Sequence, residues 1–210
     1  MRKTERVAGV IHALKEAYPD PVCALHYSKD YELMIAVHLS AQCTDERVNK
    51  VTPALFAAYP SLESFAAARV EDVETLVHSC GFYKHKAKDI VDACRELLDR
   101  FNGKVPDNMD DLLSLPGVGR KTANLLLGDL YGKPAVVCDT HCIRIAGKLG
   151  LTDGTKDPHK AEMQLWKILP KEESSDFCHR IVLHGRAVCT ARSPRCSECT
   201  LSPYCKSVAD

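Results

Sequence analysis

The stretch Leu115-Pro116-Gly117-Val118-Gly119-Arg120-Lys121-Thr122-Ala123 decides the fold, because it predicts a tight turn that leads directly into a helix. Apolar residues at helical spacing flank it, so we expect helices over residues 108–115 and 122–131. Two glycines around one valine permit positive backbone angles and a close approach by a large partner. Free N–H groups at the start of the second helix suit phosphate oxygens. A plain connector between antiparallel helices is the alternative interpretation.

The rest of the chain also predicts helices. Almost every segment of the 210 residues repeats its apolar side chains with helical period, and strand-like alternation is nearly absent. The stripe over residues 87–101 ends before Gly103, a common helix stop. Asp157 followed by Pro158, and Ser174 or the next serine, are typical helix starts. We therefore expect an all-α protein that is large enough to bury its own core.

Charge and cysteine usage limit the class of protein. The 28 basic and 28 acidic side chains cancel, so net charge gives no support for nucleic-acid binding. Bases outnumber acids from Arg180 onward, which indicates either a one-sided basic face or ordinary solvated charges. No apolar run approaches the roughly 20 residues of a membrane span, and the first residues predict an amphipathic helix, not a secretion signal. Eleven cysteines without such a signal favour a reducing compartment, so we expect a cytoplasmic, non-secreted protein.

Four cysteines in the last part of the chain have the order Cys189-x6-Cys196-x2-Cys199-x5-Cys205. Their thiolates can converge on a metal if the backbone loops around it, and two nearby prolines favour such turns. Only Cys196 and Cys199 have the short spacing that is usual in zinc knuckles, so spacing alone leaves zinc and iron–sulfur open. The other seven cysteines are scattered through apolar segments, and most of them are expected to be core hydrophobes.

Two side chains are candidates for chemistry. Lys121 is expected in the first turn of a helix, where the macrodipole disfavours a cation by about 0.3–1 kcal/mol, so a purely structural role explains it poorly. Asp139 lies between an apolar run and a predicted helix, which makes capping its default role. Its neighbours Cys138, His141 and Cys142 lack a fourth ligand for a metal. We expect core packing for these cysteines and a pocket-side role for His141.

These motifs together resemble one family. The glycine turn with its lysine is similar to the helix-hairpin-helix element of base-excision DNA glycosylases. The cysteine spacing, preceded by Leu183-His184-Gly185-Arg186, looks like the cluster loop of the endonuclease III family. Residues 31–45, with the sequence YELMIAVHLSAQCTD, resemble the early helix and turn of that family. The resemblance thus covers essentially the whole chain, and it selects a [4Fe–4S] cluster with a structural role over zinc.

The resemblance implies two helical lobes with a DNA-binding groove between them. The first is a helical barrel lobe over residues 23–132, with the helix-hairpin-helix at 108–131. The second is a cluster lobe made of residues 1–22 and 133–210, with the iron–sulfur loop at 189–205. The implied partner is double-stranded DNA containing a damaged base or an abasic site. We expect a monomer that is associated with the nucleoid and has no membrane partner.

The implied activity is removal of oxidised or ring-saturated pyrimidines, followed by cleavage of the abasic site by β-elimination. In this family a lysine at the position of Lys121 attacks the sugar and forms a Schiff base. An aspartate in a Val-Asp-Thr-His context, here Asp139, stabilises the charge that develops as the base leaves. The hairpin commonly binds a DNA phosphate with help from a monovalent cation on its backbone carbonyls.

The resemblance also implies which residues contact DNA. Gln42 fills the gap left by the extruded nucleotide, and Phe82 stands where the family usually places an aliphatic wedge; burial beneath its loop is the alternative for Phe82. The full set of implied DNA contacts is Gln42, Phe82, Gly117, Val118, Gly119, Arg120, His141, Arg192 and Arg195.

Two other functions are weighed against this one. A monofunctional mismatch adenine glycosylase shares the hairpin and the cluster, but it typically lacks the lysine and carries a further C-terminal domain, so Lys121 and the end at Asp210 disfavour it. A non-catalytic DNA-binding module would use the hairpin and the cluster only as structure.

Overall fold

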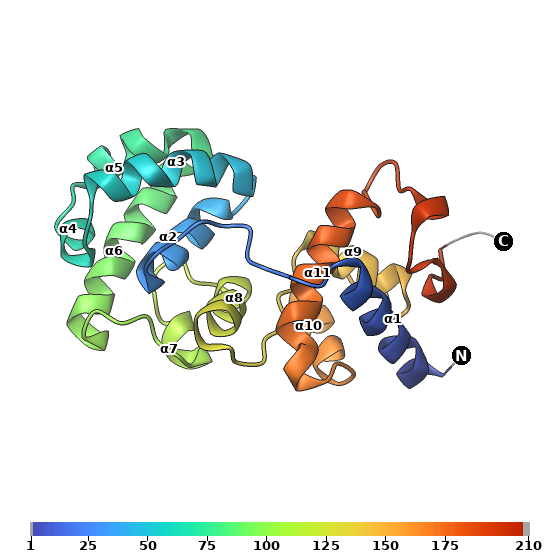
Figure 1. The fold of residues 1–210 in the computed structure, drawn as a ribbon. Helices are drawn as coiled ribbons and strands as arrows, with labels where there is room; N and C mark the ends of the chain where they lie inside the picture. The colour runs from blue at the N-terminus through green and yellow to red at the C-terminus, as the bar shows by residue number, and fades with distance from the viewer. Residues whose placement is uncertain (1, 208–210) are drawn as a thin grey trace. The chain divides into compact units, whose positions relative to one another are not determined.

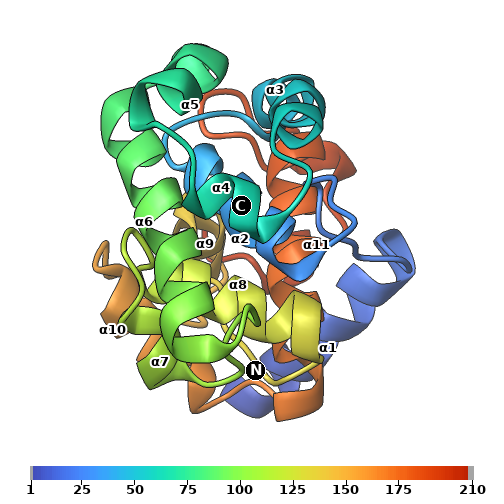
Figure 2. The same cartoon turned by 90° about the vertical axis from the view of Figure 1, so that its left-hand side faces the viewer.

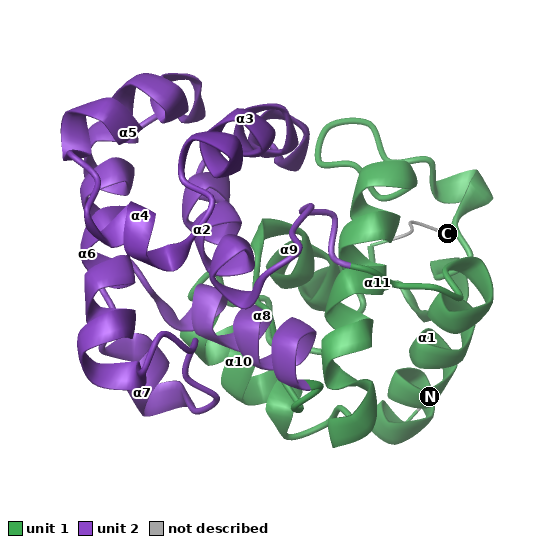
Figure 3. Ribbon diagram, turned by 60° about the vertical axis from the view of Figure 1, so that its left-hand side comes forward, with its two compact units in different colours: residues 1–22, 132–210 green, residues 23–131 purple. Residues whose placement is uncertain are grey.

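The computed structural model describes residues 2–207, and within that range it contains helices and their connections but no strand (Figure 1). The expected all-α class is therefore confirmed. The chain divides into two compact units, unit 1 made of residues 1–22 and 132–210 and unit 2 made of residues 23–131 (Figure 3). No helix within residues 2–207 has both the length and the apolar character of a membrane span.

Unit 2 is built from seven α-helices and one short 3₁₀ helix. They are α2 (Asp30–Ser40), α3 (Asp45–Ala58), α4 (Leu62–Ala66), α5 (Val70–Val77), the 3₁₀ helix His78–Cys80, α6 (Tyr83–Phe101), α7 (Met109–Leu113) and α8 (Arg120–Tyr131). The stop expected at Gly103 is confirmed: α6 ends at Phe101, and Asn102 and Gly103 have positive φ angles of 51° and 73°.

Helix α2 is the centre of unit 2. Its residues from Leu33 to Leu39 are all buried, which explains why its sequence is apolar on every side. It contacts α3, α6 and α8 (Figure 2). Glu32, at the exposed end of the helix, accepts the backbone N–H groups of Ser28 and Lys29 at 2.8 and 3.2 Å, and so caps the helix start. Helix α8, which follows the glycine turn, is thus packed on this buried helix, and α7 packs on α8.

The described part of unit 1, residues 2–22 and 132–207, contains four α-helices and three 3₁₀ helices. They are α1 (Lys3–Ala17), α9 (Thr140–Lys148), α10 (Pro158–Trp166), the 3₁₀ helix Lys171–Glu173, α11 (Ser174–Ala187), and the 3₁₀ helices Cys196–Glu198 and Ser202–Tyr204. Helix α11 contacts both α1 and α9. Asp157 caps α10 from the expected position, with Pro158 as the first helical residue.

The start of α11 differs in detail from the expectation. Ser174 is the first helical residue, and the N-cap residue is Glu173, whose side chain makes no capping bond. The Ser174 hydroxyl is used elsewhere: it donates to the Lys171 carbonyl at 2.7 Å and accepts the Ala135 N–H at 3.1 Å. The serine therefore secures the buried segment that leads to α9, a tertiary contact that local sequence signals do not show.

Candidate functional site

The glycine turn of unit 2 lies directly against two other helices. Gly117 has a φ angle of +72°, and a Cβ atom added there would come within 2.6 Å of the His38 ring and 2.9 Å of the Asp89 side chain. The Nε2 atom of His38 lies 2.9 Å from the Pro116 carbonyl oxygen, and its Nδ1 lies 2.8 Å from the Met34 carbonyl. A glycine is required here both for backbone conformation and for space.

The turn leads into α8 two residues earlier than expected, at Arg120. Lys121 is therefore the second helical residue, and its side chain is exposed, while Ala123 and Leu126 of the same helix are fully buried. Val118 is also buried, with 6% of its surface exposed, and its N–H donates to the Leu115 carbonyl at 3.2 Å. Val118 therefore faces the interior of unit 2, whereas Gly117, Gly119 and the Lys121 side chain are exposed.

The position of Gly119 differs from that of Gly117. No other atom lies within 4 Å of a Cβ built on Gly119, and its φ angle is not in the left-handed range. Its carbonyl accepts the Ala123 N–H at 2.9 Å, which closes the first turn of α8. Backbone N–H groups in the first turn of a helix have no hydrogen-bond acceptor within that helix. Open space beside these donors suits a phosphate.

Gln42 and Phe82 follow two different elements of unit 2, α2 and the 3₁₀ helix. Both are non-glycine residues with positive φ angles, 53° for Gln42 and 47° for Phe82. Both side chains are exposed, and Phe82 exposes 64% of its surface, so the alternative that Phe82 is buried beneath its loop is wrong. An exposed phenyl ring on a strained backbone is consistent with a residue kept for binding.

In unit 1, Asp139 is the N-cap of α9, as its sequence position indicates. Its Oδ1 accepts the Cys142 N–H at 2.7 Å. His141, one residue into the helix, is half-buried, and its Nδ1 lies 3.3 Å from Nη2 of Arg144. Because a guanidinium can only donate, Nδ1 is the acceptor and the ring carries its proton on Nε2. This fixes the His141 tautomer with a donor at the opposite edge of the ring.

The cysteines next to Asp139 belong to the core. Cys138, Cys142 and Cys178 are buried, and the Val137 N–H donates to the Cys178 sulfur at 3.2 Å. Hydrogen bonds with Cys138 and Cys178, together with burial, raise the pKa of the Cys142 thiol well above its usual value. The Cys142 thiol is therefore a protonated packing group, and Cys138 and Cys178 are buried beside it.

The four cysteines of the loop 189–205 are not in disulfides. Burial raises the pKa of the Cys199 thiol, and repulsion from Cys189, Cys205 and Cys196 raises it further, so each of these three lies close to Cys199. A group of thiolates so placed would be costly without a cation between them.

Donors from the surrounding elements point at these sulfurs. Nη1 of Arg144 lies 3.4 Å from the Cys189 sulfur, and the Ser207 N–H lies 3.4 Å from the Cys205 sulfur. Nε2 of His184, on α11, is 3.4 Å from the Cys199 sulfur, and its Nδ1 is 3.3 Å from the Tyr18 hydroxyl. N–H···S contacts of this kind are typical of thiolates that hold iron–sulfur clusters.

The basic residues of the loop lie at its surface. Arg192 is exposed, and Arg195 donates to the Ala187 carbonyl and pairs with Glu198 at 3.4 Å. Arg195 therefore also holds its own loop in place.

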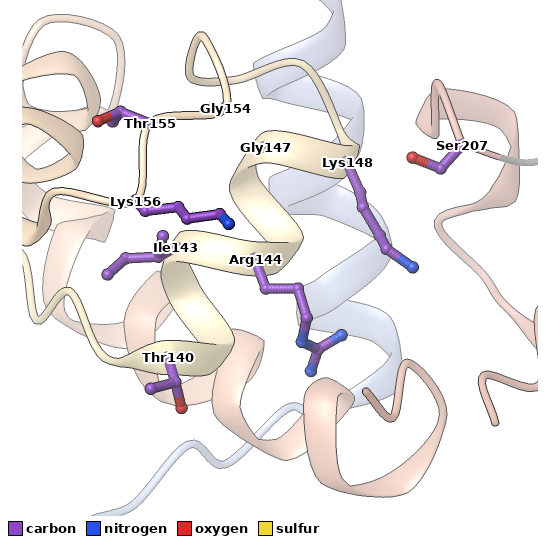
Figure 4. Close-up of a pocket in the computed structure, with 9 residues that line it drawn as sticks. All are labelled: Thr140, Ile143, Arg144, Gly147, Lys148, Gly154, Thr155, Lys156 and Ser207. Carbon is purple, nitrogen blue, oxygen red and sulfur yellow. The ribbon is translucent and has the colours of Figure 1, made fainter. Parts of the chain in front are cut away.

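A basic pocket on α9 was not predicted from the sequence. It is open, has a volume of about 580 Å³, and includes Arg144, Lys148 and Lys156 but no acidic side chain. Arg144 and Lys148 extend from successive turns of α9, and Lys156 reaches toward the same helix from the following loop (Figure 4). The i, i+4 spacing of Arg144 and Lys148 was visible in the sequence, but Lys156 joins them only through the fold. The lining suits an anion.

Comparison with known proteins identifies the family. Residues 35–171 match the model of the HhH-GPD superfamily of base excision DNA repair proteins, and residues 189–205 match that of the iron–sulfur binding domain of endonuclease III. Endonuclease III of Synechocystis sp. is 47% identical over 206 residues, covering 98% of this chain and 94% of the relative. Endonuclease III of Escherichia coli (strain K12) is 39% identical, covering 98% and 97%.

Solved structures agree with these sequence matches. A trapped endonuclease III–DNA covalent intermediate is similar with a TM-score of 0.93 at 40% identity, covering 98% of this chain and 97% of that chain. A non-covalent endonuclease III–DNA complex also gives a TM-score of 0.93 at 40% identity, covering 98% and 96%. A thermostable thymine-DNA glycosylase shares the fold, with a TM-score of 0.83 at 20% identity.

The fold and the hairpin thus define a base-excision DNA repair protein of the helix-hairpin-helix class. Within that class, the chain belongs to the endonuclease III family. It is a DNA N-glycosylase and abasic-site lyase that binds DNA and carries a [4Fe–4S] cluster. The choice of iron–sulfur over zinc is confirmed.

The two glycines of the turn give a matched pair of variants. We expect Gly117→Ala to lower the free energy of unfolding by about 1–3 kcal/mol, because it combines a left-handed backbone with a clash against His38. Gly119→Ala should change it by less than about 0.5 kcal/mol, because its Cβ enters open space. Urea unfolding followed by circular dichroism measures both; equal losses for the two variants would contradict this account of the turn.

The cysteine loop predicts a coloured protein. Protein purified without oxygen should absorb light at about 410 nm, as bound iron–sulfur clusters do, whereas zinc would leave it colourless. Cys199→Ser should abolish this band and the bound iron, while Cys23→Ala, a half-buried cysteine of unit 2, should keep both. Iron and sulfide analysis beside the spectrum checks the result, and a colourless zinc-loaded parent protein would overturn the assignment.

Proposed function

We propose that Lys121 is the nucleophile of the lyase reaction. The observation that carries the proposal is its place on a fixed helix start, exposed beside the open side of the glycine turn. Its amine has no hydrogen bond or ion pair with a described residue of unit 2. A lysine presented in this way is available to a sugar whose phosphate binds the turn.

The chemistry follows from an amine at that position. Once the damaged nucleotide is extruded, the Lys121 nitrogen forms a bond to C1′ of the sugar, and the bond from C1′ to the base breaks. Loss of the C1′–O4′ bond gives a protonated Schiff base, which acidifies the proton on C2′. Removal of that proton expels the 3′ phosphate oxygen and breaks the strand by β-elimination. The lysine is released when water hydrolyses the imine.

Asp139 stabilises positive charge on the sugar as the base leaves. Its cap uses one oxygen, Oδ1, on the Cys142 N–H, so the second oxygen is available to the substrate. The capping bond also fixes the direction of the carboxylate, which is what electrostatic stabilisation requires. For this division of roles, one extruded nucleotide must meet both Lys121 and Asp139 when DNA is bound.

The remaining predicted residues serve DNA binding in this proposal. Backbone donors of Gly119 and Arg120 bind a phosphate of the damaged strand, helped by a monovalent cation on the turn's carbonyls. His141, in the first turn of α9, contacts another phosphate. Gln42 and Phe82 enter the duplex at the lesion, and Arg192 and Arg195 contact the backbone from the cluster loop. Buried Val118 contributes shape to the turn and no side-chain contact.

The substrate class is oxidised or ring-saturated pyrimidines, an expectation from membership of the family. The protein acts as a monomer on chromosomal DNA, in the cytoplasm and associated with the nucleoid. The cluster, when bound, neutralises the four thiolates and holds the loop 189–205 against α9. The monofunctional adenine glycosylase and the non-catalytic DNA-binding module are not favoured by the sequence and structure matches.

Borohydride reduction tests the nucleophile. On a duplex with one abasic site, the parent protein should form a covalent adduct, and Lys121→Ala should form none because no imine is available for reduction. Lys104→Ala, at an exposed lysine of the same unit, should form as much adduct as the parent. Denaturing gels measure the adduct; an undiminished adduct in Lys121→Ala would remove this residue from its proposed role.

Asp139→Asn separates charge from capping. Asparagine caps a helix as well as aspartate does, so the unfolding free energy should change by less than about 1 kcal/mol. Loss of the carboxylate charge should slow base release by about 10²-fold or more under single-turnover conditions. If Asp139→Asn released thymine glycol as fast as the parent while Asp139→Ala did not, capping alone would explain the residue.

A further inference from the structure

Lys86 is a lysine whose ammonium group is buried in unit 2. It lies in the first turn of α6 and exposes 6% of its surface. Its Nζ atom is 2.9 Å from the Leu39 carbonyl oxygen, 2.7 Å from that of Ala41 and 2.5 Å from that of Cys80. An ammonium has three N–H donors, so these three bonds use all of them. Burial lowers the pKa of this amine, and the three carbonyls are its compensating partners.

The three carbonyls come from two segments that each lead into a loop. Leu39 and Ala41 lie at the end of α2, and Ala41 directly precedes Gln42. Cys80 ends the 3₁₀ helix, and only Gly81 separates it from Phe82. Because the carbonyl oxygens of Ala41 and Cys80 both lie within 2.7 Å of one nitrogen, the two loops are held side by side. The backbone N–H of Lys86 also donates to the Phe82 carbonyl at 3.2 Å.

Both loops carry a strained residue at their tip. Gln42 and Phe82 have φ angles of 53° and 47°, a region of the backbone map that is strained for residues other than glycine. Such conformations persist only where the surroundings enforce them. The Lys86 ammonium binds the carbonyl of Ala41, the residue before Gln42. It also binds the Cys80 carbonyl, while the Lys86 backbone N–H binds the Phe82 carbonyl, so both sides of Phe82 are held.

We propose that Lys86 is a positioning residue that fixes Gln42 and Phe82 relative to each other, so that both side chains can enter the DNA together. The inference rests on the proposed function, in which these two side chains occupy the duplex where the nucleotide is extruded. Lys86 touches no substrate: its ammonium is enclosed by carbonyl oxygens, and it acts only through the two loops. The two inserting side chains, which lie 40 residues apart in the sequence, are thereby joined through a single charged group.

The proposal predicts different effects on two substrates. Lys86→Met keeps the chain length and removes the donors, so the loops lose their common tie. Base release from a duplex that contains thymine glycol should slow by about 10- to 100-fold in a single turnover, because extrusion needs both inserting residues in place. Strand cleavage at an abasic site in single-stranded DNA, which needs no extrusion, should stay within about twofold of the parent. Lys88→Met, at an exposed lysine of the same helix, should match the parent on both substrates.

A double-mutant cycle tests whether Lys86 acts through these loops. In a background of Gln42→Ala and Phe82→Ala, Lys86→Met should slow duplex base release by less than about twofold further, because the residues it positions are already truncated. An undiminished effect in that background, an equal loss on both substrates, or no loss on the duplex each overturns the proposal. If Lys86→Met does not fold, Lys86→Arg, which keeps a cation and N–H donors but not the fit of the ammonium, replaces it in the same cycle.

Failure of the proposed function has a different signature. It appears in the parent protein itself, as the absence of base release and of a trapped adduct. Failure of the Lys86 inference appears only in the variants, while the parent remains active.

Discussion

The close fit of Gly117 against α2 and α6 is the constraint on which the rest of the site depends. With His38 and Asp89 occupying the place of a side chain, and His38 bound to the Pro116 carbonyl, the turn has one position on its unit. That position sets where α8 begins and therefore where Lys121 is presented. The chemistry of the lysine is thus determined by a packing contact on the opposite side of the turn.

A second constraint of the same kind holds the two residues that we propose enter the DNA. Gln42 and Phe82 are exposed and strained, so their conformations depend on the layer beneath them. The buried ammonium of Lys86 provides this support by binding carbonyls of both loops. Helix α2 contributes to both constraints, because its His38 contacts the Pro116 carbonyl at the glycine turn and its Leu39 carbonyl binds Lys86. The buried helix of unit 2 therefore supports both the turn that we propose binds a phosphate and the residues that we propose enter the duplex.

Sequence reasoning predicted the features that are local. The helical class, the stop at Gly103, the cap at Asp139 and the glycine turn follow from short-range patterns, and the structure has each of them. Four cysteines predicted a metal centre, but their spacing alone left zinc and iron–sulfur open; the resemblance selected the cluster, and the family match confirms it. The proposed roles of Lys121 and Asp139 came from resemblance, because no pattern shows what a side chain acts upon.

The features that the sequence did not predict are contacts between residues that are far apart in the chain and meet only in the fold. Nothing in the neighbourhood of Lys86 shows that three carbonyls from two loops meet its amine, and His38 in an apolar helix reads as a core residue until Pro116 is found beside it. Ser174 starts a helix as expected, but its hydroxyl makes no capping bond and instead links Lys171 to the buried backbone at Ala135. In each case the partner is distant in sequence, and only the folded chain supplies it.

The central claim is that the amine at the start of α8 forms the bond to the sugar. Its most direct measurement is peptide mapping by mass spectrometry of the borohydride-reduced complex after digestion of protein and DNA. The account predicts that the remaining sugar fragment is attached to Lys121. A fragment found on another lysine or on the amino terminus would contradict it.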